Sequence, residues 1–240
     1  MKGIKQKTLK MKKENLILSV VLMTAITVSS CGRSVSNEKS SSKEEAPSNQ
    51  VTVVEEVTAI EEITIGTQIW MTQNLNVAKF RNGDSIPQAK TNEEWKKAGK
   101  NKQPAWCYYD NNQKNGEKYG KLYNWYAVND ARNMAPKGWH IPSDAEWTEI
   151  QKQLLESKNS KIGLFNNYSG FRLSQGKFNW INKCAGWWST TEITEYAAVG
   201  RSSYGNSNQL GGLHDDMDYG SKKLGLSVRC VKDNSTKNPY

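Results

Sequence analysis

Tryptophan is the residue that most restricts how this chain can fold. The sequence holds 9 tryptophans, spread from Trp70 to Trp188, whereas its aliphatic residues are comparatively few. A folded core must therefore be built largely from indole rings, and each buried indole N–H needs a hydrogen-bond acceptor. Frequent Gly, Asn and Ser residues between short apolar runs predict short strands joined by many irregular connections.

The first thirty residues predict export from the cytoplasm. Six lysines and one glutamate come before an apolar run of about 13 residues, Leu16–Val28. Because a membrane-spanning helix needs roughly 20 such residues, residues 1–30 are typical of a secretory signal peptide. The run ends in Val28-Ser29-Ser30-Cys31, which resembles the lipobox of bacterial lipoproteins. This resemblance implies cleavage before Cys31 and acylation of its thiol, with palmitate as an expected modification.

Residues 31–56 are expected to form a flexible tether between the lipid anchor and the folded domain. The segment after Cys31 is rich in Ser, Glu, Lys and Asn and cannot bury enough apolar surface to fold. Gly32 in place of an aspartate favours the outer membrane of a Gram-negative bacterium, on either its periplasmic or its surface face. The leader supplies +5 of the formal charge of +9, which leaves +4 without a dense basic run, so no nucleic-acid partner is expected.

Residues 57–234 have the length of one domain, followed by a short tail at 235–240. Two helices are predicted in its first half. The first covers Tyr119–Asn133 and is stopped by Pro136. The second covers Asp144–Glu156, because Ser143 and Glu146 form a capping box. In this second helix one apolar face is formed by Trp147, Ile150, Leu154 and Leu155.

Strands are predicted on both sides of the two helices. Residues 61–75 alternate apolar and polar side chains around Gly66, which predicts a hairpin. Further short strands are expected at 104–110, 185–192, 196–204 and 224–233. This order of elements predicts an α+β fold with an antiparallel sheet.

Five motifs resemble the Fibrobacter succinogenes major paralogous domain, which occurs in secreted and lipid-anchored bacterial proteins. They are IGTQIWMTQNLNV at 65–77, YGKLYNWYAV at 119–128, PKGWHIPSDAEW at 136–147, WWSTTE at 187–192 and SVRCVKD at 227–233. The resemblance implies a C-type lectin-like fold, with two helices before short, looped, mostly antiparallel strands. The family is largely uncharacterised biochemically, so the resemblance implies a fold more than a function.

Three cysteines remain beyond Cys31, and an oxidising compartment would allow two of them to pair. Many members of the family have a cysteine at the position of Ala135. Because this chain has an alanine at that position, it cannot form the long disulfide that is usual in lectin-like folds. We therefore expect Cys107 to pair with Cys230 and Cys184 to stay free.

His140 is the histidine of the PKGWH motif, and we interpret it as a structural residue rather than a catalyst. Trp139 and Trp147 are expected to pack beneath the sheet. No nucleophile motif such as GxSxG, no HExxH and no phosphate-binding loop occurs, so no enzymatic activity and no cofactor are expected. A pair of glycosidase carboxylates stays open as an alternative, because no sequence feature selects or excludes one.

The acidic run at Asp215, Asp216 and Asp218 offers carboxylate oxygens that calcium would accept. Its spacing is not that of a calcium-binding hand. The calcium motifs of sugar-binding C-type lectins are also missing from the sequence. We interpret this run as a solvated loop and expect no metal site.

A binding module for a glycan or a surface protein is the function that the sequence favours. Aromatic rings stack on sugar faces, while amide and carboxylate groups bind hydroxyls. The candidate ligand residues lie in two predicted loops and are Trp180, Tyr204, Asn206, Asn208 and Asp216. Two alternatives remain: an envelope lipoprotein that docks to another protein without a small ligand, and a hydrolase.

Overall fold

The computed structural model describes residues 60–156, 165–205, 210–213 and 220–234. Cys31, the predicted signal peptide, the tether and the C-terminal tail lie outside this part of the chain. Strand β8 (Cys184–Glu192) runs through the middle of the described fold and is buried over most of its length. Successive side chains of a strand point to opposite faces. Trp187 and Trp188 therefore enter two different hydrophobic clusters.

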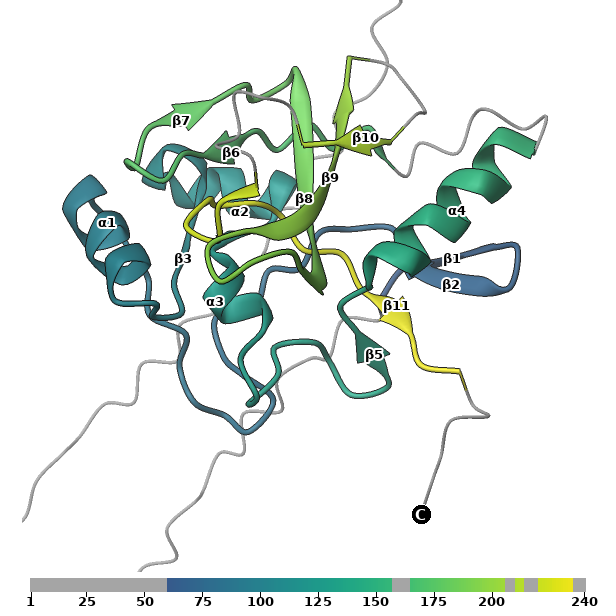
Figure 1. Cartoon of the computed structure of the whole chain (residues 1–240), viewed down its shortest axis with the longest axis horizontal. Coiled ribbons are helices and arrows are strands. Elements are labelled where there is room, and N and C mark those ends of the chain that lie inside the picture. The colour runs from purple at the N-terminus through teal and green to yellow at the C-terminus, as the bar shows by residue number, and fades with distance from the viewer. Residues whose placement is uncertain (1–59, 157–164, 206–209, 214–219, 235–240) are drawn as a thin grey trace, which may run out of the picture. The chain divides into compact units, whose positions relative to one another are not determined.

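The strands of the described residues form four small antiparallel sheets (Figure 1). One has the order β1 (Glu62–Ile65), β2 (Gln68–Met71), β11 (Val231–Lys232) and β5 (Trp139–His140). A second joins β10 (Gly211–Gly212) and β9 (Ala198–Tyr204) to β8. Two hairpin-like pairs are β3 (Trp106–Cys107) with β4 (Leu122–Tyr123), and β6 (Phe171–Arg172) with β7 (Phe178–Asn179).

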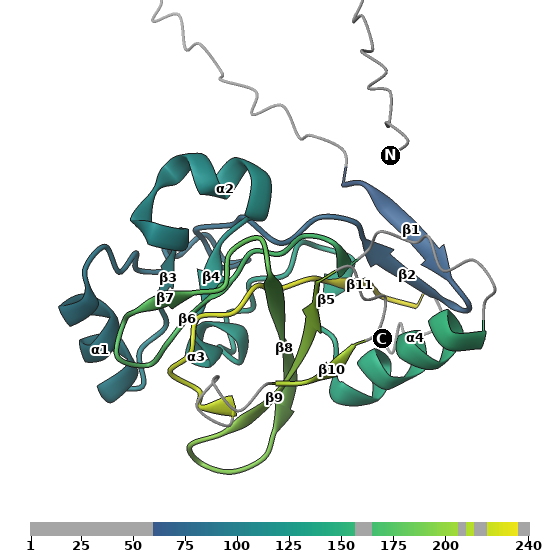
Figure 2. The same cartoon turned by 90° about the horizontal axis from the view of Figure 1, so that it is seen from above.

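Four α-helices lie in the described residues, and they are α1 (Asn92–Lys100), α2 (Gln113–Tyr119), α3 (Trp125–Val128) and α4 (Asp144–Glu156). A 3-10 turn covers Tyr109–Asn111. Helix α4 packs beside β8 and the β1–β2 hairpin, while α1 and α2 lie on the other side of β8 (Figure 2). The α+β class is confirmed, but the prediction of only two helices is wrong.

The predicted helix over Tyr119–Asn133 is wrong in a specific way. Its middle is divided between strand β4 and the single turn of α3. Asn124 causes the division, because its buried side-chain oxygen accepts hydrogen bonds from the backbone N–H groups of Ala105 and Ala127, at 3.0 and 3.1 Å. The first of these bonds joins segments that are distant in the sequence, so a tertiary contact overrides the local helical pattern.

The predicted second helix is confirmed with its capping box. Ser143 accepts a bond from the Glu146 backbone, and Glu146 accepts one from the Ser143 backbone at 2.8 Å. Trp147 and Ile150 are fully buried. Leu155 differs from the prediction, since it is 62% exposed near the end of the helix.

The expectation of an aromatic core is confirmed. Eight of the nine tryptophans are buried, including Trp139 and Trp147, and Trp180 is the exception. Seven of the eight buried indole N–H groups donate to acceptors within the described fold. Trp188 donates to the Tyr123 carbonyl and Trp187 donates to the Asn74 side chain, both at 2.8 Å. Indole rings thus supply apolar contact and also tie neighbouring segments together.

The expected disulfide is absent from the structure. Cys107, Cys184 and Cys230 are all free and buried. The Cys107–Cys230 pairing fails because Cys107 lies in a cluster with Trp95 and Leu122, whereas Cys230 lies in another cluster.

None of the helices in the described residues is long and apolar enough to span a membrane.

Candidate functional site

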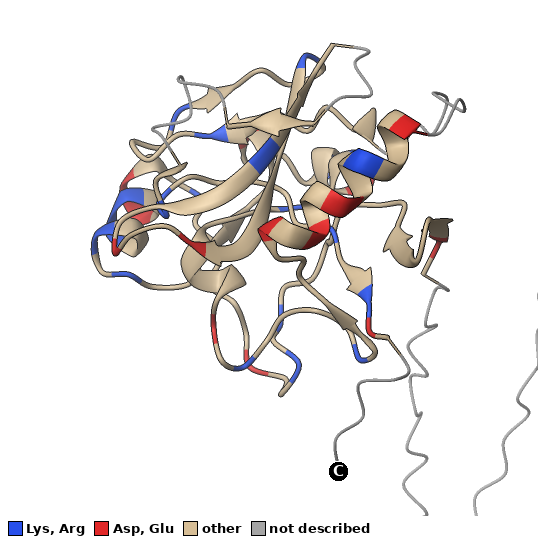
Figure 3. Cartoon of the chain, turned by 45° about the vertical axis from the view of Figure 1, so that its right-hand side comes forward, with Lys and Arg blue, Asp and Glu red and all other residues tan. Residues whose placement is uncertain are grey.

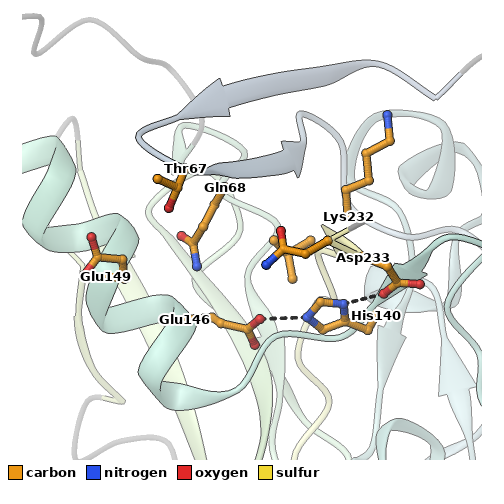
Figure 4. Close-up of a pocket in the computed structure, with 9 residues that line it drawn as sticks. Thr67, Gln68, His140, Glu146, Glu149, Lys232 and Asp233 are labelled. Atoms are coloured by element: carbon orange, nitrogen blue, oxygen red, sulfur yellow. Dashed lines mark hydrogen bonds and ion pairs between the residues drawn. The ribbon is translucent and has the colours of Figure 1, made fainter. Parts of the chain in front are cut away.

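An open pocket of about 570 Å³ lies where α4 meets the edge of the four-stranded sheet (Figure 4). We call it the His140 pocket. Its lining comes from the β1–β2 turn, β5, α4 and the end of β11, and it comprises Thr67, Gln68, His140, Glu146, Glu149, Val231, Lys232, Asp233 and Asn234. Three regions that are far apart in the sequence, residues 67–68, 140–149 and 231–234, therefore meet around one histidine.

His140 is held between two carboxylates. Its Nε2 lies 2.8 Å from Glu146 Oε1, and its Nδ1 lies 2.7 Å from Asp233 Oδ1. Strand pairing explains this placement, because Val231 of β11 faces His140 of β5 and Asp233 follows two residues later. A neutral imidazole donates only one of these bonds, whereas the protonated ring donates both.

The two ion pairs shift the protonation of the group. The hydrogen bond to Glu146 raises the pKa of His140, with a further contribution from Asp233, although partial burial opposes the shift. Partial burial raises the pKa of Glu146, but hydrogen bonds from His140 and Ser143 outweigh this and lower it to about 2. Glu146 is therefore ionised at neutral pH, which is unsuitable for a general acid.

The charged groups around His140 are engaged with the fold rather than directed at one empty point. Lys232 extends away from His140 in Figure 4, and its amine pairs with Glu62 at 2.7 Å. Red acidic segments recur along α4 in Figure 3, with a blue basic segment near its end, and this helix supplies Glu146 and Glu149 to the pocket lining. Both ring nitrogens of His140 are used, so the arrangement acts as a clamp between β5, α4 and β11.

A second, shallower hollow of about 580 Å³ is formed by Tyr109, Trp180, Ile181 and Lys183. We call these four residues the Trp180 hollow. Trp180 is partly exposed, unlike every other tryptophan in the chain. Its ring packs edge-on against Tyr204, with ring centroids 5.3 Å apart and an interplanar angle of 82°. An aromatic ring is thus held firmly on one edge while it borders an open hollow.

The backbone around Trp180 is unusual. Trp180 has a φ of 69° and Asn182 a φ of 61°, a left-handed region that a bulky side chain rarely adopts. The turn is fixed because the Trp180 carbonyl accepts bonds from the N–H groups of Lys183 and Cys184, each at 3.0 Å. Such strain costs on the order of 1–2 kcal/mol. Strained residues concentrate at functional sites, where the surrounding fold maintains them.

Gly170 allows this turn to lie against the rest of the fold. A β-carbon at Gly170 would come within 2.7 Å of the Asn179 carbonyl oxygen and 2.8 Å of the Ile181 nitrogen. Its φ of 65° also favours glycine. The sequence therefore provides the space that the strained Trp180 turn requires.

The structure brings together two of the predicted ligand residues, Trp180 and Tyr204. The other predicted ligand residues, Asn206, Asn208 and Asp216, lie outside the described residues, as do Asp215 and Asp218. Sequence reasoning missed Tyr109 and Lys183, which line the hollow. Lys183 could have been found from its place in the same short turn as Trp180. In the described part of the chain, no group of three or more His, Cys, Asp or Glu side chains is arranged to hold a metal ion.

Comparison with known families finds a match within the folded part of the chain. Residues 63–163 match the model of the Fibrobacter succinogenes major domain. The chain is similar to that family over these residues. The match contains the His140–Glu146 pair and ends before the Trp180 turn. Strand β11 also lies outside the matched residues, although it is inserted between β2 and β5 in one sheet. No curated protein and no solved structure matches the chain.

Proposed function

We propose that this protein is a lipid-anchored component of the bacterial cell envelope whose folded domain binds a glycan through the Trp180 hollow. The single observation that carries the proposal is Trp180 itself. Eight tryptophans are buried in the core, while this one borders a hollow in a strained backbone conformation. Full burial of the Trp180 side chain would stabilise the fold more than its partial exposure does. A role in binding therefore explains the position of Trp180 better than packing does.

The chemistry of the hollow suits a sugar. An indole face offers apolar area to the C–H surface of a pyranose ring, and it loses little conformational entropy on binding. Polar groups surround it: Lys183 lines the hollow, and the exposed Asn182 accepts a bond from the Tyr119 hydroxyl at 2.6 Å. Binding sites commonly combine an aromatic wall with a few polar groups in this way.

The leader and the tether support the location in this proposal. A lipid on Cys31, followed by a flexible segment, would hold the domain away from the outer membrane and present it to a ligand. A C-type lectin-like relationship is part of the same proposal. It is supported by the family resemblance and by the order of the elements, in which α3 and α4 precede strands β8 and β9.

A glycan array probed with the purified full chain in detergent tests the binding function. The array is read with calcium and with a chelator, so that a metal requirement is detected independently of the ligand. We expect one glycan class to bind, and we expect Trp180→Asn to weaken binding about tenfold through loss of stacking. Asparagine tolerates the left-handed backbone, so the variant should fold. An array without any binding, obtained with folded protein, would refute the proposal.

A second candidate function, docking to another envelope protein, is favoured by one observation. The turn between β8 and β9 exposes two large apolar side chains, Ile193 at 59% and Tyr196 at 67%. Tyr196→Asn is therefore the matched control for Trp180→Asn. If the domain binds a glycan, Tyr196→Asn should leave glycan affinity unchanged. If the domain docks to an envelope protein, Tyr196→Asn should reduce recovery of that protein from crosslinked envelopes, whereas Trp180→Asn should not.

A further inference from the structure

Among the described residues, Lys183 is the one charged residue in the lining of the Trp180 hollow. We infer that the hollow selects acidic glycans, whose sugars carry a carboxylate or a sulfate beside the face that stacks on Trp180. The inference rests on the proposed glycan-binding function and specifies its ligand class. The anionic group is the feature of the ligand that Lys183 would recognise.

The backbone of Lys183 is fixed while its side chain is exposed. Its N–H donates to the Trp180 carbonyl at 3.0 Å, and its own carbonyl accepts from the Gly205 N–H at 3.0 Å. The lysine is therefore held three residues from the ring in the same turn. A long side chain on a fixed backbone can bring its ammonium group over the hollow while the charge stays hydrated.

The ammonium group of Lys183 is available for a ligand as far as the described residues go. Two other lysines differ from it in this respect: Lys102 pairs with Glu195 at 2.6 Å, and Lys232 pairs with Glu62 at 2.7 Å. Within residues 60–156, 165–205, 210–213 and 220–234, Lys183 forms no ion pair. The charge beside the hollow is therefore not neutralised by an acid from these segments.

A second cation lies beside the same turn. The Lys118 amine lies 4.7 Å from the centroid of the Tyr119 ring, whose hydroxyl donates to Asn182, the neighbour of Lys183. Two acids belong to nearby segments, Asp110 and Glu117, but neither lines the hollow. The described residues that line the hollow therefore carry one positive charge and no negative charge, which complements a carboxylate or a sulfate.

Matched oligosaccharide pairs test the inference with the full chain in detergent. One pair is oligogalacturonate and its methyl-esterified form, which differ in carboxylate charge. The other pair is sulfated and unsulfated dextran of equal length. We expect the charged member of at least one pair to bind about three- to fivefold more tightly, because a partly exposed ion pair contributes a modest amount. Comparison of the two pairs distinguishes a carboxylate from a sulfate.

Lys183→Gln should remove the preference for the charged member while retaining binding that depends on Trp180. The matched control is Lys137→Gln, which removes one exposed lysine beside β5 and should leave the preference unchanged. About 0.5 M salt should reduce the preference in the unmodified protein through screening. Equal binding of charged and neutral members, unaffected by Lys183→Gln, would overturn the inference and leave the proposed function intact. Absence of binding to every glycan would overturn both.

Discussion

At the scale of single residues, His140 links segments that are 93 residues apart in the chain. The pKa of His140 is raised by its carboxylate partners, so its contribution to stability is complete below its unfolded pKa of about 6.5. This contribution disappears as the pH rises through the folded pKa. The pKa of Glu146, lowered to about 2, adds a contribution that is complete above about pH 4.5 and is lost as the pH falls towards 2.

We therefore predict that His140→Ala lowers the melting temperature most between about pH 4.5 and 6.5. The ring is 38% exposed, so solvent screening limits the loss to about 1 kcal/mol, or about 2–4 °C. The measurement is a series of thermal melts of both proteins from about pH 5 to 9. The difference should shrink as the pH rises, and glycan binding at neutral pH should be unchanged. A pH-independent difference would argue against the ion pairs as its source.

The sequence supports the interpretation of His140 as structural, but it does not identify how the residue is held. The capping partner Glu146 was visible from its spacing to Ser143, because that contact is local. Asp233 was not visible, since only the pairing of β11 with β5 brings it near. Trp180 was selected from its loop composition, whereas its exposure and its φ of 69° depend on packing that no local pattern records.

At the scale of elements, one buried arginine joins the β6–β7 pair to the start of α1. Arg172 of β6 donates to the carbonyls of Gly176, Ala89 and Thr91, at 2.9–3.0 Å. Its guanidinium also lies 4.8 Å from the centroid of the Trp95 ring. The bonds to Gly176 and Ala89 are buried and the bond to Thr91 is part-buried, so water cannot readily replace Arg172 as the donor to the first two carbonyls. The arginine thus positions α1 on the fold.

Replacement of Arg172 by methionine should destabilise the protein by about 3 kcal/mol. The apolar volume is largely kept, but two buried carbonyls and one part-buried carbonyl lose their donor. Equilibrium urea unfolding should show a midpoint lower by about 1–2 M without a change in slope. Arg132→Met is the control, because Arg132 pairs with Asp130 and Asp84 at the surface, and its midpoint should scarcely move. A similar effect from both variants would contradict the role given to Arg172.

Element prediction succeeded where the signal was local and failed where a distant contact decided the structure. Helix α4 has a capping box and an apolar face, and the sequence pattern predicts both. Helix α1 begins with an equivalent box, Thr91 with Glu94, so its sequence signal was present and was missed. Strand β4 and helix α3 share a segment with a helical pattern, and the contacts of Asn124 with a preceding segment separate them.

At the scale of the whole molecule, three buried thiols report on how the fold opens. Burial raises the pKa of Cys107 to about 11 and the pKa of both Cys184 and Cys230 to about 12. Thiolates are the reactive species, so these cysteines should resist alkylation at about pH 8 while the protein is folded. Cys107 belongs to one hydrophobic cluster, and Cys184 and Cys230 belong to another.

If the two clusters open as one cooperative unit, all three thiols should be alkylated at the same rate under mildly denaturing conditions. The prediction follows from β3, which contributes Trp106 to the cluster of Cys184 and Cys230 and Cys107 to the other cluster. Its partner β4 is divided in the same way between Tyr123 and Leu122, so neither cluster can open while this strand pair stays in place. Peptide mass spectrometry after timed alkylation measures each cysteine separately. Faster modification of Cys107 alone would mean that α1 and β3 open independently.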